Sequence, residues 1–166
     1  MIDKSKNMIE LYPLGKDKDI IYKALSGNKD LVALVLGENN LTDKFKDRFF
    51  NTLFVDTEQL TANTYITIDT EIVNAENRNT KCIAITMDIF TALSMIPLTL
   101  AEQNKYYSLN YFGNRVDICL DMIKRIISDL DIGIGATTLA PRNPVRIVQP
   151  TISHYGKRIV FYSYDF

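Results

Sequence analysis

The side chains best suited to covalent chemistry are two cysteines and one histidine. Cys82, Cys119 and His154 are the only residues of these two types in the 166-residue sequence. A thiol beside an imidazole base can act as a nucleophile. Both cysteines fall inside segments that look regular, and His154 lies in a sequence typical of a turn. We therefore interpret the cysteines as buried free thiols, and a single histidine excludes a multi-histidine metal site.

Two further motifs have the residue types of a binding site. Gly133-Ile134-Gly135 resembles part of a phosphate-binding loop, but it follows a predicted helix and lacks the third glycine and the lysine of such loops. Asp117 and Asp121 are one helical turn apart and could share a cation. Lys124 and Arg125 lie beside them, which favours a solvated, ion-paired face. We expect no catalytic residue, no cofactor and no metal.

The composition is ordinary for a soluble globular protein, with 46% hydrophobic residues, 23% charged residues and a formal net charge of -1. Charges of both signs are interspersed, whereas a dedicated nucleic-acid-binding protein carries a basic stripe or block. The N-terminal residues MIDKSKNMIELYPLG contain no apolar signal-peptide core, and no apolar run is long enough to span a membrane. We expect one domain over residues 1–166, with residues 1–18 as a candidate N-terminal arm and no membrane partner.

Two short helices are predicted in the first third of the chain. The first covers residues 19–25 and stops at Ser26-Gly27-Asn28, in the manner of a C-terminal cap. The second covers residues 29–36. Residues 44–55 stay undecided, because their apolar spacing of four suits a helix while Leu53-Phe54-Val55 suits a strand.

Residues 115–130 form the most clearly amphipathic helix. Asn114 can cap it, and Asp117 places a negative charge in its first turn, where it suits the helix dipole. Ile118 and Met122 fall outside the main apolar stripe, which indicates a contact on the helix flank as well. The stripe itself consists of Val116, Cys119, Leu120, Ile123, Ile126, Ile127 and Leu130.

The strand signals are alternations of apolar and polar residues. Residues 65–90 alternate in two runs, which predicts a long β-hairpin with one buried and one wetter face. Residues 74–80 between the runs predict a polar turn of several residues rather than a tight two-residue turn. A second strand pair is predicted at residues 145–153 and 158–165, with a turn at 154–157. The order α-β-β-α-β-β predicts an α+β fold, with a largely antiparallel sheet of two hairpins packed against helices.

Residues 94–112 are predicted as a long irregular connection, because Pro97 interrupts them and no period holds. Aromatic side chains gather at the end of this connection and on one face of the last strand, where Ile159 and Phe161 occupy the opposite face. A strand with apolar groups on both faces has to be covered, and a neighbouring subunit is one candidate. The aromatic residues are Tyr106, Tyr107, Tyr111 and Phe112 in the connection, and Tyr162, Tyr164 and Phe166 in the strand.

The order of elements resembles that of the small neck proteins of tailed bacteriophages, which include tail terminators and related head-to-tail joining proteins. The resemblance runs from about Asp19 to Phe166 and is carried by IYKALSGNKDLVALVLG, the long hairpin, GNRVDICLDMI and the closing YGKRIVFYSYDF. It is one of element order and local sequence character. No single motif carries it.

The resemblance implies a virion structural protein, assembled in the host cytoplasm, that forms a ring, typically a hexamer, at the top of the tail tube. The partners would be copies of the chain and tail-tube, sheath or head-connector proteins, with DNA only passing through as cargo. The 94–112 connection is longer than a minimal terminator needs, which leaves another neck ring or a sheath contact open. The interface residues expected from this architecture are Asn74, Glu76, Asn77, Arg78, Asn79, Tyr106, Tyr107, Tyr111, Phe112, Tyr162, Tyr164 and Phe166.

Two other classes of function stay open at this point. One is a small cytosolic enzyme or ligand-binding domain with a pocket under the 94–112 connection. The other is a monomeric binding module for a single host or phage partner.

Overall fold

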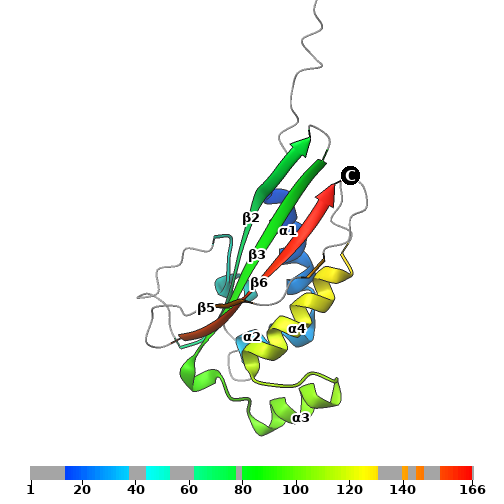
Figure 1. Ribbon diagram of the computed structural model, residues 1–166. Helices are drawn as coiled ribbons and strands as arrows, with labels where there is room; N and C mark the ends of the chain where they lie inside the picture. The colour runs from blue at the N-terminus through cyan, green and yellow to red at the C-terminus, as the bar shows by residue number, and fades with distance from the viewer. Residues whose placement is uncertain are drawn as a thin grey trace, which may run out of the picture.

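Helices cover one face of a β-sheet (Figure 1). The computed structural model describes residues 14–37, 44–52, 62–77, 80–130, 140–141, 145–147 and 154–165. The expected α+β fold, with a largely antiparallel sheet packed against helices, is confirmed. The helices are α1 (Leu14–Ser26), α2 (Lys29–Leu36), α3 (Leu100–Ser108) and α4 (Arg115–Ser128).

The sheet is built around three long strands in the order β2-β3-β6. The two-residue strand β1 pairs parallel to β2 at one edge, and two short strands pair antiparallel to β6 at the other. Every other pairing is antiparallel. The strands are β1 (Phe49–Phe50), β2 (Thr64–Asn77), β3 (Thr80–Ala92), β4 (Ala140–Pro141), β5 (Val145–Ile147) and β6 (His154–Asp165).

The end of the β2–β3 hairpin differs from the prediction. Asn77 pairs with Thr80, so the polar residues from Asn74 onward continue β2 and only residues 78–79 connect the strands. The predicted turn of several residues is therefore wrong. The register shifts after Ile72 and again after Asn74, and such bulges let a polar segment stay extended while its pairing is interrupted. Arg78 and Asn79 themselves lie outside the described residues.

The predicted turn at residues 154–157 is also wrong, because β6 begins at His154 and pairs with β3 along its whole length. Gly156 lies opposite Phe90, and a Cβ atom there would come within 2.8 Å of the Phe90 Cβ and 2.9 Å of the Ile89 carbonyl oxygen. The glycine permits close packing between two strands rather than a turn. Of the strand predicted at 145–153, residues 145–147 are confirmed as β5; the remainder, including Pro150, lies outside the described part of the chain.

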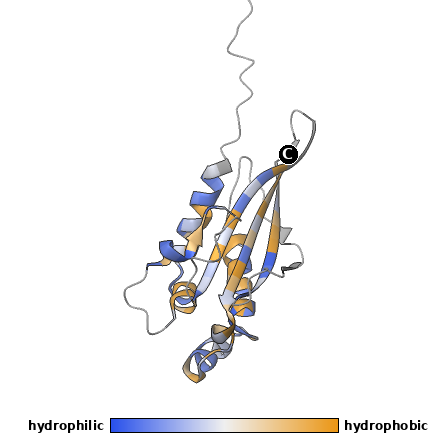
Figure 2. Ribbon diagram, turned by 90° about the vertical axis from the view of Figure 1, so that its left-hand side faces the viewer, coloured by the Kyte–Doolittle hydropathy of each residue, from blue (hydrophilic) through white to orange (hydrophobic). Residues whose placement is uncertain are grey.

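One face of the sheet is the floor of the core, as the alternation predicted. Hydrophobic residues line the space between this face and the helices (Figure 2). Ile72 continues the alternation of Ile66 and Ile68, which predicts a buried side chain, but it is 44% exposed. The buried residues of this face are Ile66, Ile68, Ile83, Ile85, Met87, Ile89, Ile159 and Phe161.

The opposite face of the sheet is only partly exposed to solvent. Thr67, Asp88 and Phe90 on this face are buried, whereas Glu71 near the hairpin end is exposed. The guanidinium of Arg158 donates two hydrogen bonds to the Asp88 carboxylate, at 2.7 and 2.9 Å, and this pairing raises the pKa of Arg158. The uniformly wetter face that the alternation predicted is therefore limited to the outer half of the hairpin.

The helix predictions hold closely for α2 and α4. Asn28 caps α2 by accepting from the Leu31 backbone N–H at 3.0 Å. Asn114 and Asp117 form a reciprocal capping box at the start of α4. Ile118 and Met122 are buried, because α4 packs against α1 and α2 as well as against β3 and β6. The flank contact expected for α4 is thus confirmed.

Three segments are more regular than predicted. Helix α1 begins at Leu14, earlier than the predicted start at residue 19. Residues 45–48 form a 3-10 helix that leads directly into β1, while Leu53-Phe54-Val55 lies outside the described residues. The supposed irregular connection 94–112 contains α3, which Thr99 caps by accepting from the Glu102 backbone N–H at 3.2 Å.

Candidate assembly surfaces

Of the three groups considered for covalent chemistry, Cys119 and His154 lie on opposite faces of the sheet. Cys119 is fully buried in α4, on the helix-covered face, and burial raises the pKa of its thiol to about 12. His154 lies on the other face, with its ring 5.9 Å from that of Phe90. A Cys119–His154 pair is therefore not formed. The side chain of Cys82 lies outside the described part.

Within the described ranges, no group of three or more histidine, cysteine, aspartate or glutamate side chains could hold a metal ion. Asp117 and Asp121, which could have shared a cation, have separate cationic partners: Lys157 for Asp117 and Lys124, at 3.5 Å, for Asp121. The Asp117 contact raises the pKa of Lys157. The ion-paired interpretation of this helix face is correct. No helix in the same ranges is long and apolar enough to cross a membrane.

Large apolar side chains are exposed around α3, at the lower end of the molecule in Figure 1. Leu100 is 73% exposed and Phe112 is 59% exposed. The Phe112 ring packs against Tyr107, with a centroid separation of 5.3 Å. Four of the five exposed large apolar side chains of the described chain lie between Leu93 and Phe112, which makes this segment a candidate for contact with another molecule. We call this surface the α3 platform; it consists of Leu93, Leu100, Leu109 and Phe112.

Buried polar contacts hold the α3 platform in place. Arg115 at the start of α4 donates from Nε to the Met95 carbonyl and from Nη1 to the Leu34 carbonyl, each at 2.8 Å, and from Nη2 to the Glu102 carboxylate. One side chain thus joins α2, α3, α4 and the segment before α3. The Arg115 and Glu102 side chains are both buried, and the charge-assisted hydrogen bond between them fixes the position of α3 relative to the start of α4.

Tyr106 forms a second attachment between α3 and α2. Its hydroxyl donates to the Asp30 carbonyl at 2.9 Å, and the Lys105 amine lies 3.1 Å from the Asp30 carboxylate. Tyr106 is only 1% exposed, and burial raises its pKa. It was expected at an interface, but its ring belongs to the core of its own chain. The enzyme or ligand-binding hypothesis predicts a pocket under residues 94–112. That region is occupied by the buried side chains of Tyr106, Glu102 and Arg115.

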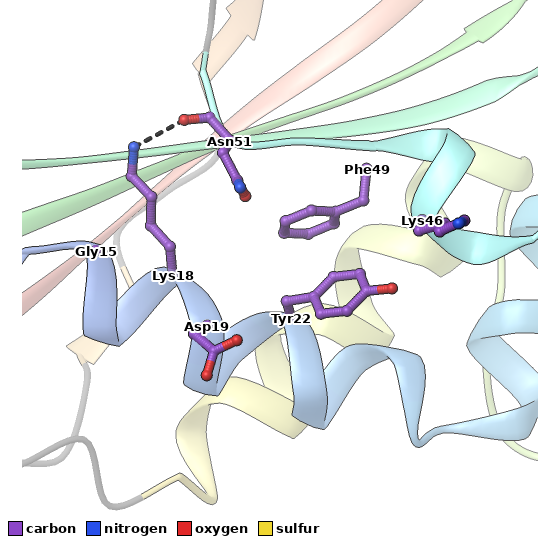
Figure 3. Close-up of a pocket in the computed structure, with 7 residues that line it drawn as sticks. All are labelled: Gly15, Lys18, Asp19, Tyr22, Lys46, Phe49 and Asn51. Carbon is purple, nitrogen blue, oxygen red and sulfur yellow. Dashed lines mark hydrogen bonds between the residues drawn. The ribbon is translucent and has the colours of Figure 1, made fainter.

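A groove opens between α1 and the segment that forms β1 (Figure 3). Its volume is about 540 Å³, and its floor is aromatic: the rings of Tyr22 and Phe49 meet edge to face with centroids 5.1 Å apart. Lys18 and Asn51 lie at one end of the groove and Lys46 at the other. We call it the α1–β1 groove; its lining is Gly15, Lys18, Asp19, Tyr22, Lys46, Phe49 and Asn51.

Lys18 connects this groove to the edge of the sheet. Its amine donates to the Asn51 carbonyl at 2.8 Å and lies 2.7 Å from the Asp69 carboxylate on β2. The hydrogen bond from Lys18 lowers the pKa of Asp69. In the described chain β1 pairs with β2 only as far as Thr67, and Lys18 lies beside the strand just past that point. A charged side chain in such a place discourages pairing with foreign strands.

The other expected interface residues fall into three groups. Tyr107 is half-buried beneath Phe112, and Tyr111 is half-buried with the Arg125 guanidinium 4.2 Å from the centre of its ring. Tyr162 is half-buried on the face of β6 opposite Phe161. Asn74, Glu76, Asn77 and Tyr164 lie in paired strands whose side chains are not described there, and Arg78, Asn79 and Phe166 lie outside the described residues.

The sequence analysis did not predict the α1–β1 groove or the role of Arg115 in anchoring α3 to α2 and α4. Phe45 and Phe49 were noticed as a spacing of four, which suggested one helix face. In fact the chain changes from a 3-10 helix to a strand between them. The Arg115–Glu102 ion pair could not be predicted from a sequence pattern, because residues that pair across two separate helices have no characteristic separation along the chain. An arginine at the first position of a helix, where a positive charge opposes the dipole, is the signal that could have marked it.

The structure is similar to a chain in the virion of the native gene transfer agent (GTA) particle. The TM-score is 0.57 and the sequence identity 11%, and the match covers 93% of this chain and 98% of that chain. At this identity the likeness establishes a shared fold. No curated protein sequence matches the chain.

The model of one protein family, YomW, matches residues 17–163. The matched range starts in α1 and ends in β6, so it takes in the α3 platform, the lining of the α1–β1 groove except Gly15, and the whole described β2–β3 hairpin. The chain belongs to the YomW family.

Proposed function

We propose that this chain is a structural protein of a phage-type virion. The observation that carries the proposal is the shared fold with a virion chain, over 93% of this chain and 98% of the other. A match along nearly the full length of both chains supports a building block of the same size and shape. The assignment of a function by shared fold is an analogy, so surface properties have to support it independently.

Those properties are the exposed α3 platform and the buried contacts behind it. A free-standing monomer gains nothing from holding Leu100 and Phe112 in water, whereas a subunit gains from burying them against a neighbour. Arg115 and Tyr106 hold the platform in one position, which reduces the ordering needed on binding. By contrast, the described residues bring no thiol and imidazole together.

Within the virion, we propose a ring at the head–tail junction, as a tail terminator that caps the tail tube and joins it to the head connector. Head-to-tail contacts between identical subunits close into a ring when the rotation permits. The seams would use the hairpin end, the last strand and the α3 region, with a hexamer as the expected symmetry. The proposed seam residues are Asn74, Glu76, Asn77, Arg78, Asn79, Tyr107, Tyr111, Phe112, Tyr162, Tyr164 and Phe166.

The test is a deletion of the gene in the phage or prophage that encodes it, together with mass spectrometry of purified particles. We expect the chain in wild-type particles, and we expect the deletion to give tails of variable length that are not joined to heads. Absence of the chain from particles would overturn the virion role. Tails of normal length with unjoined heads would instead overturn the terminator role and leave another neck ring.

A small cytosolic enzyme or ligand-binding domain was the alternative, with its pocket under residues 94–112. Glu102 and Arg115 are buried there and bonded to each other, and the buried Tyr106 donates to the Asp30 carbonyl of α2. These contacts disfavour a ligand pocket at that location.

A further inference from the structure

We infer that α3 belongs to a strap that is released from the body of the protein as one unit, while the sheet and α1, α2 and α4 stay folded. The strap consists of α3 and the linkers on its two sides, residues 97–99 and 109–113. Release is a property of the single chain, so it does not depend on the virion role.

Helix α3 has a small attachment to the rest of the protein. It lies at the lower end of the molecule in Figure 1, below the sheet and the other helices. Only Glu102 and Tyr106 of its nine residues are buried, and they are one helical turn apart on one face. By contrast, eight of the 14 residues of α4 are buried. Segments with few buried apolar contacts are the ones that open before the rest of a fold.

The two buried side chains of α3 are attached mainly through polar groups. The Glu102 carboxylate accepts a hydrogen bond from Arg115, and the Tyr106 hydroxyl donates to the Asp30 carbonyl at 2.9 Å. A buried ion pair adds little net stability, because both charges have lost their hydration, and release gives that hydration back. Burial of the Tyr106 ring is therefore the main apolar contribution that release removes.

Arg115 keeps most of its bonds when α3 leaves. Its Nε and Nη1 donate to the Met95 and Leu34 carbonyls, and its backbone N–H donates to the Ile96 carbonyl at 3.1 Å. None of these three acceptors belongs to the strap. Release therefore breaks the bond from Arg115 to Glu102 and leaves the start of α4 in place.

The bonds that close the two ends of α3 lie inside the strap. The Thr99 hydroxyl accepts from the Glu102 N–H at 3.2 Å, and the Leu109 N–H donates to the Tyr106 carbonyl at 3.1 Å. Helix α3 can thus move with both ends intact. In the linker after it, Asn110 and Gly113 have φ of 62° and 105°, and such loop positions can absorb the backbone change of a hinge.

The strap divides the α3 platform. Leu100, Leu109 and Phe112 belong to the strap, whereas Leu93 precedes it and stays with the body. The closed position presents all four exposed side chains together, and release separates three of them from the fourth. The strap therefore controls whether the platform is complete.

The test is amide hydrogen exchange of the full chain, followed by NMR at urea concentrations below the unfolding transition. We expect the amides from Tyr106 to Tyr111 to share one opening free energy and one urea dependence. Both should be smaller than for the α4 amides from Ile118 to Ile123, because release exposes less surface than global unfolding does.

Tyr106→Phe tests the attachment without removing the ring. It deletes the hydrogen bond to the Asp30 carbonyl, so we expect the strap amides to exchange about three- to tenfold faster while the α4 amides do not change. Tyr107→Phe is the matched control on the same helix, because the Tyr107 hydroxyl has no hydrogen bond to any described residue. It should leave the exchange of both sets of amides unchanged.

Three results would overturn the inference. Equal opening free energies and urea dependences for the strap and α4 would show that α3 opens only with the core. Strap amides that exchange at individual rates with no urea dependence would show fraying of single bonds instead of release of a unit. A Tyr106→Phe variant whose α4 amides accelerate as much as its strap amides would show that the change weakens the whole fold.

Discussion

The guanidinium of Arg115, at the start of α4, donates a hydrogen bond to the carboxylate of Glu102 in α3, and the two side chains are only 3% and 5% exposed. Two charges removed from water are tolerated because each is satisfied: Arg115 also donates to the Leu34 and Met95 carbonyls. This buried ion pair therefore holds α3 against the body of the protein together with the ring of Tyr106, which lies in the core.

Arg115→Ala is expected to lower the free energy of unfolding by about 3–5 kcal/mol, because it leaves the Glu102 carboxylate buried without its partner. Replacing both residues, with Arg115→Met and Glu102→Met, is expected to restore much of that loss. Urea denaturation followed by circular dichroism measures both. Lys124→Ala is the control, since the Lys124–Asp121 pair is exposed and its loss should change stability by less than about 0.5 kcal/mol. A loss of similar size in the control and in Arg115→Ala would contradict the prediction.

Gly156→Ala is expected to destabilise the protein by about 1–3 kcal/mol. The added methyl group would lie 2.8 Å from the Phe90 Cβ and 2.9 Å from the Ile89 carbonyl oxygen, so β3 and β6 would have to separate locally. Gly15→Ala is the matched control: it lies in the first turn of α1 with no atom within 4 Å of the new methyl group. There the change should be neutral or stabilise by up to about 1 kcal/mol. Thermal melts of the two variants would show opposite or unequal shifts, and equal losses would refute the packing argument.

The elements predicted well from sequence are those whose patterns arise locally. Asn114 caps α4 through a contact within one turn, as predicted. Asn28, predicted only as part of the stop after the first helix, caps α2 in the same way. The alternation from Ile66 to Ile89 follows from the two faces of a strand. His154 was misplaced because Gly156 looks like a turn residue when its neighbour across the sheet, Phe90, is unknown.

The α3 platform and the α1–β1 groove were harder to predict, because neither arises from a local sequence pattern. In α3 the apolar Leu100 is exposed and the charged Glu102 is buried, which is the reverse of the usual apolar stripe and obscures the helix in the sequence. The α1–β1 groove needs Tyr22 beside Phe49, and residues 27 positions apart carry no shared period. Phe112 was identified as an interface candidate from aromatic clustering alone, and it is indeed exposed.

The acid titration of Asp69 provides a test of the Lys18 contact. The pKa of Asp69 lies below its ordinary value of 3.8, chiefly because Lys18 donates a hydrogen bond to it. A carboxylate with a lowered folded-state pKa contributes stability above its unfolded value, and that contribution is lost as pH falls through the folded value. Because Asp69 is about half exposed, the contribution should be only about 0.5 kcal/mol. Carboxyl carbon NMR should show the pKa rising in Lys18→Met; an unchanged value would exclude the contact.

Cys119 is expected to be unreactive in the folded protein. Its thiol is fully buried with a pKa raised to about 12, so at pH 8 only about one molecule in 10⁴ carries the thiolate. On a Cys82→Ser background, a thiol reagent such as dithionitrobenzoate should react with one thiol per chain in guanidinium chloride and with almost none in native buffer. Labelling of the native chain at the rate of a free thiol would show that α4 opens readily.

The hairpin end offers the last prediction, because it separates assembly from folding. Ile68 is buried on β2, whereas Glu71 and Ile72, nearer the hairpin end, are exposed. We expect Glu76→Lys, further along β2, to behave as a surface substitution and to change the melting temperature by no more than about 2 °C. If the hairpin end forms a seam, the same variant should prevent ring formation in size-exclusion chromatography with light scattering and reduce its incorporation into particles.

Glu71→Lys is the matched control for that variant, since it makes the same charge change on the same strand but outside the proposed seam. Normal particles from Glu76→Lys would remove the hairpin end from the interface while leaving the α3 platform as the candidate contact. Loss of assembly in both variants would point instead to the overall charge of β2. Only a defect in Glu76→Lys combined with an unchanged melt supports a subunit contact at the hairpin end, because a folding defect would lower stability and assembly together.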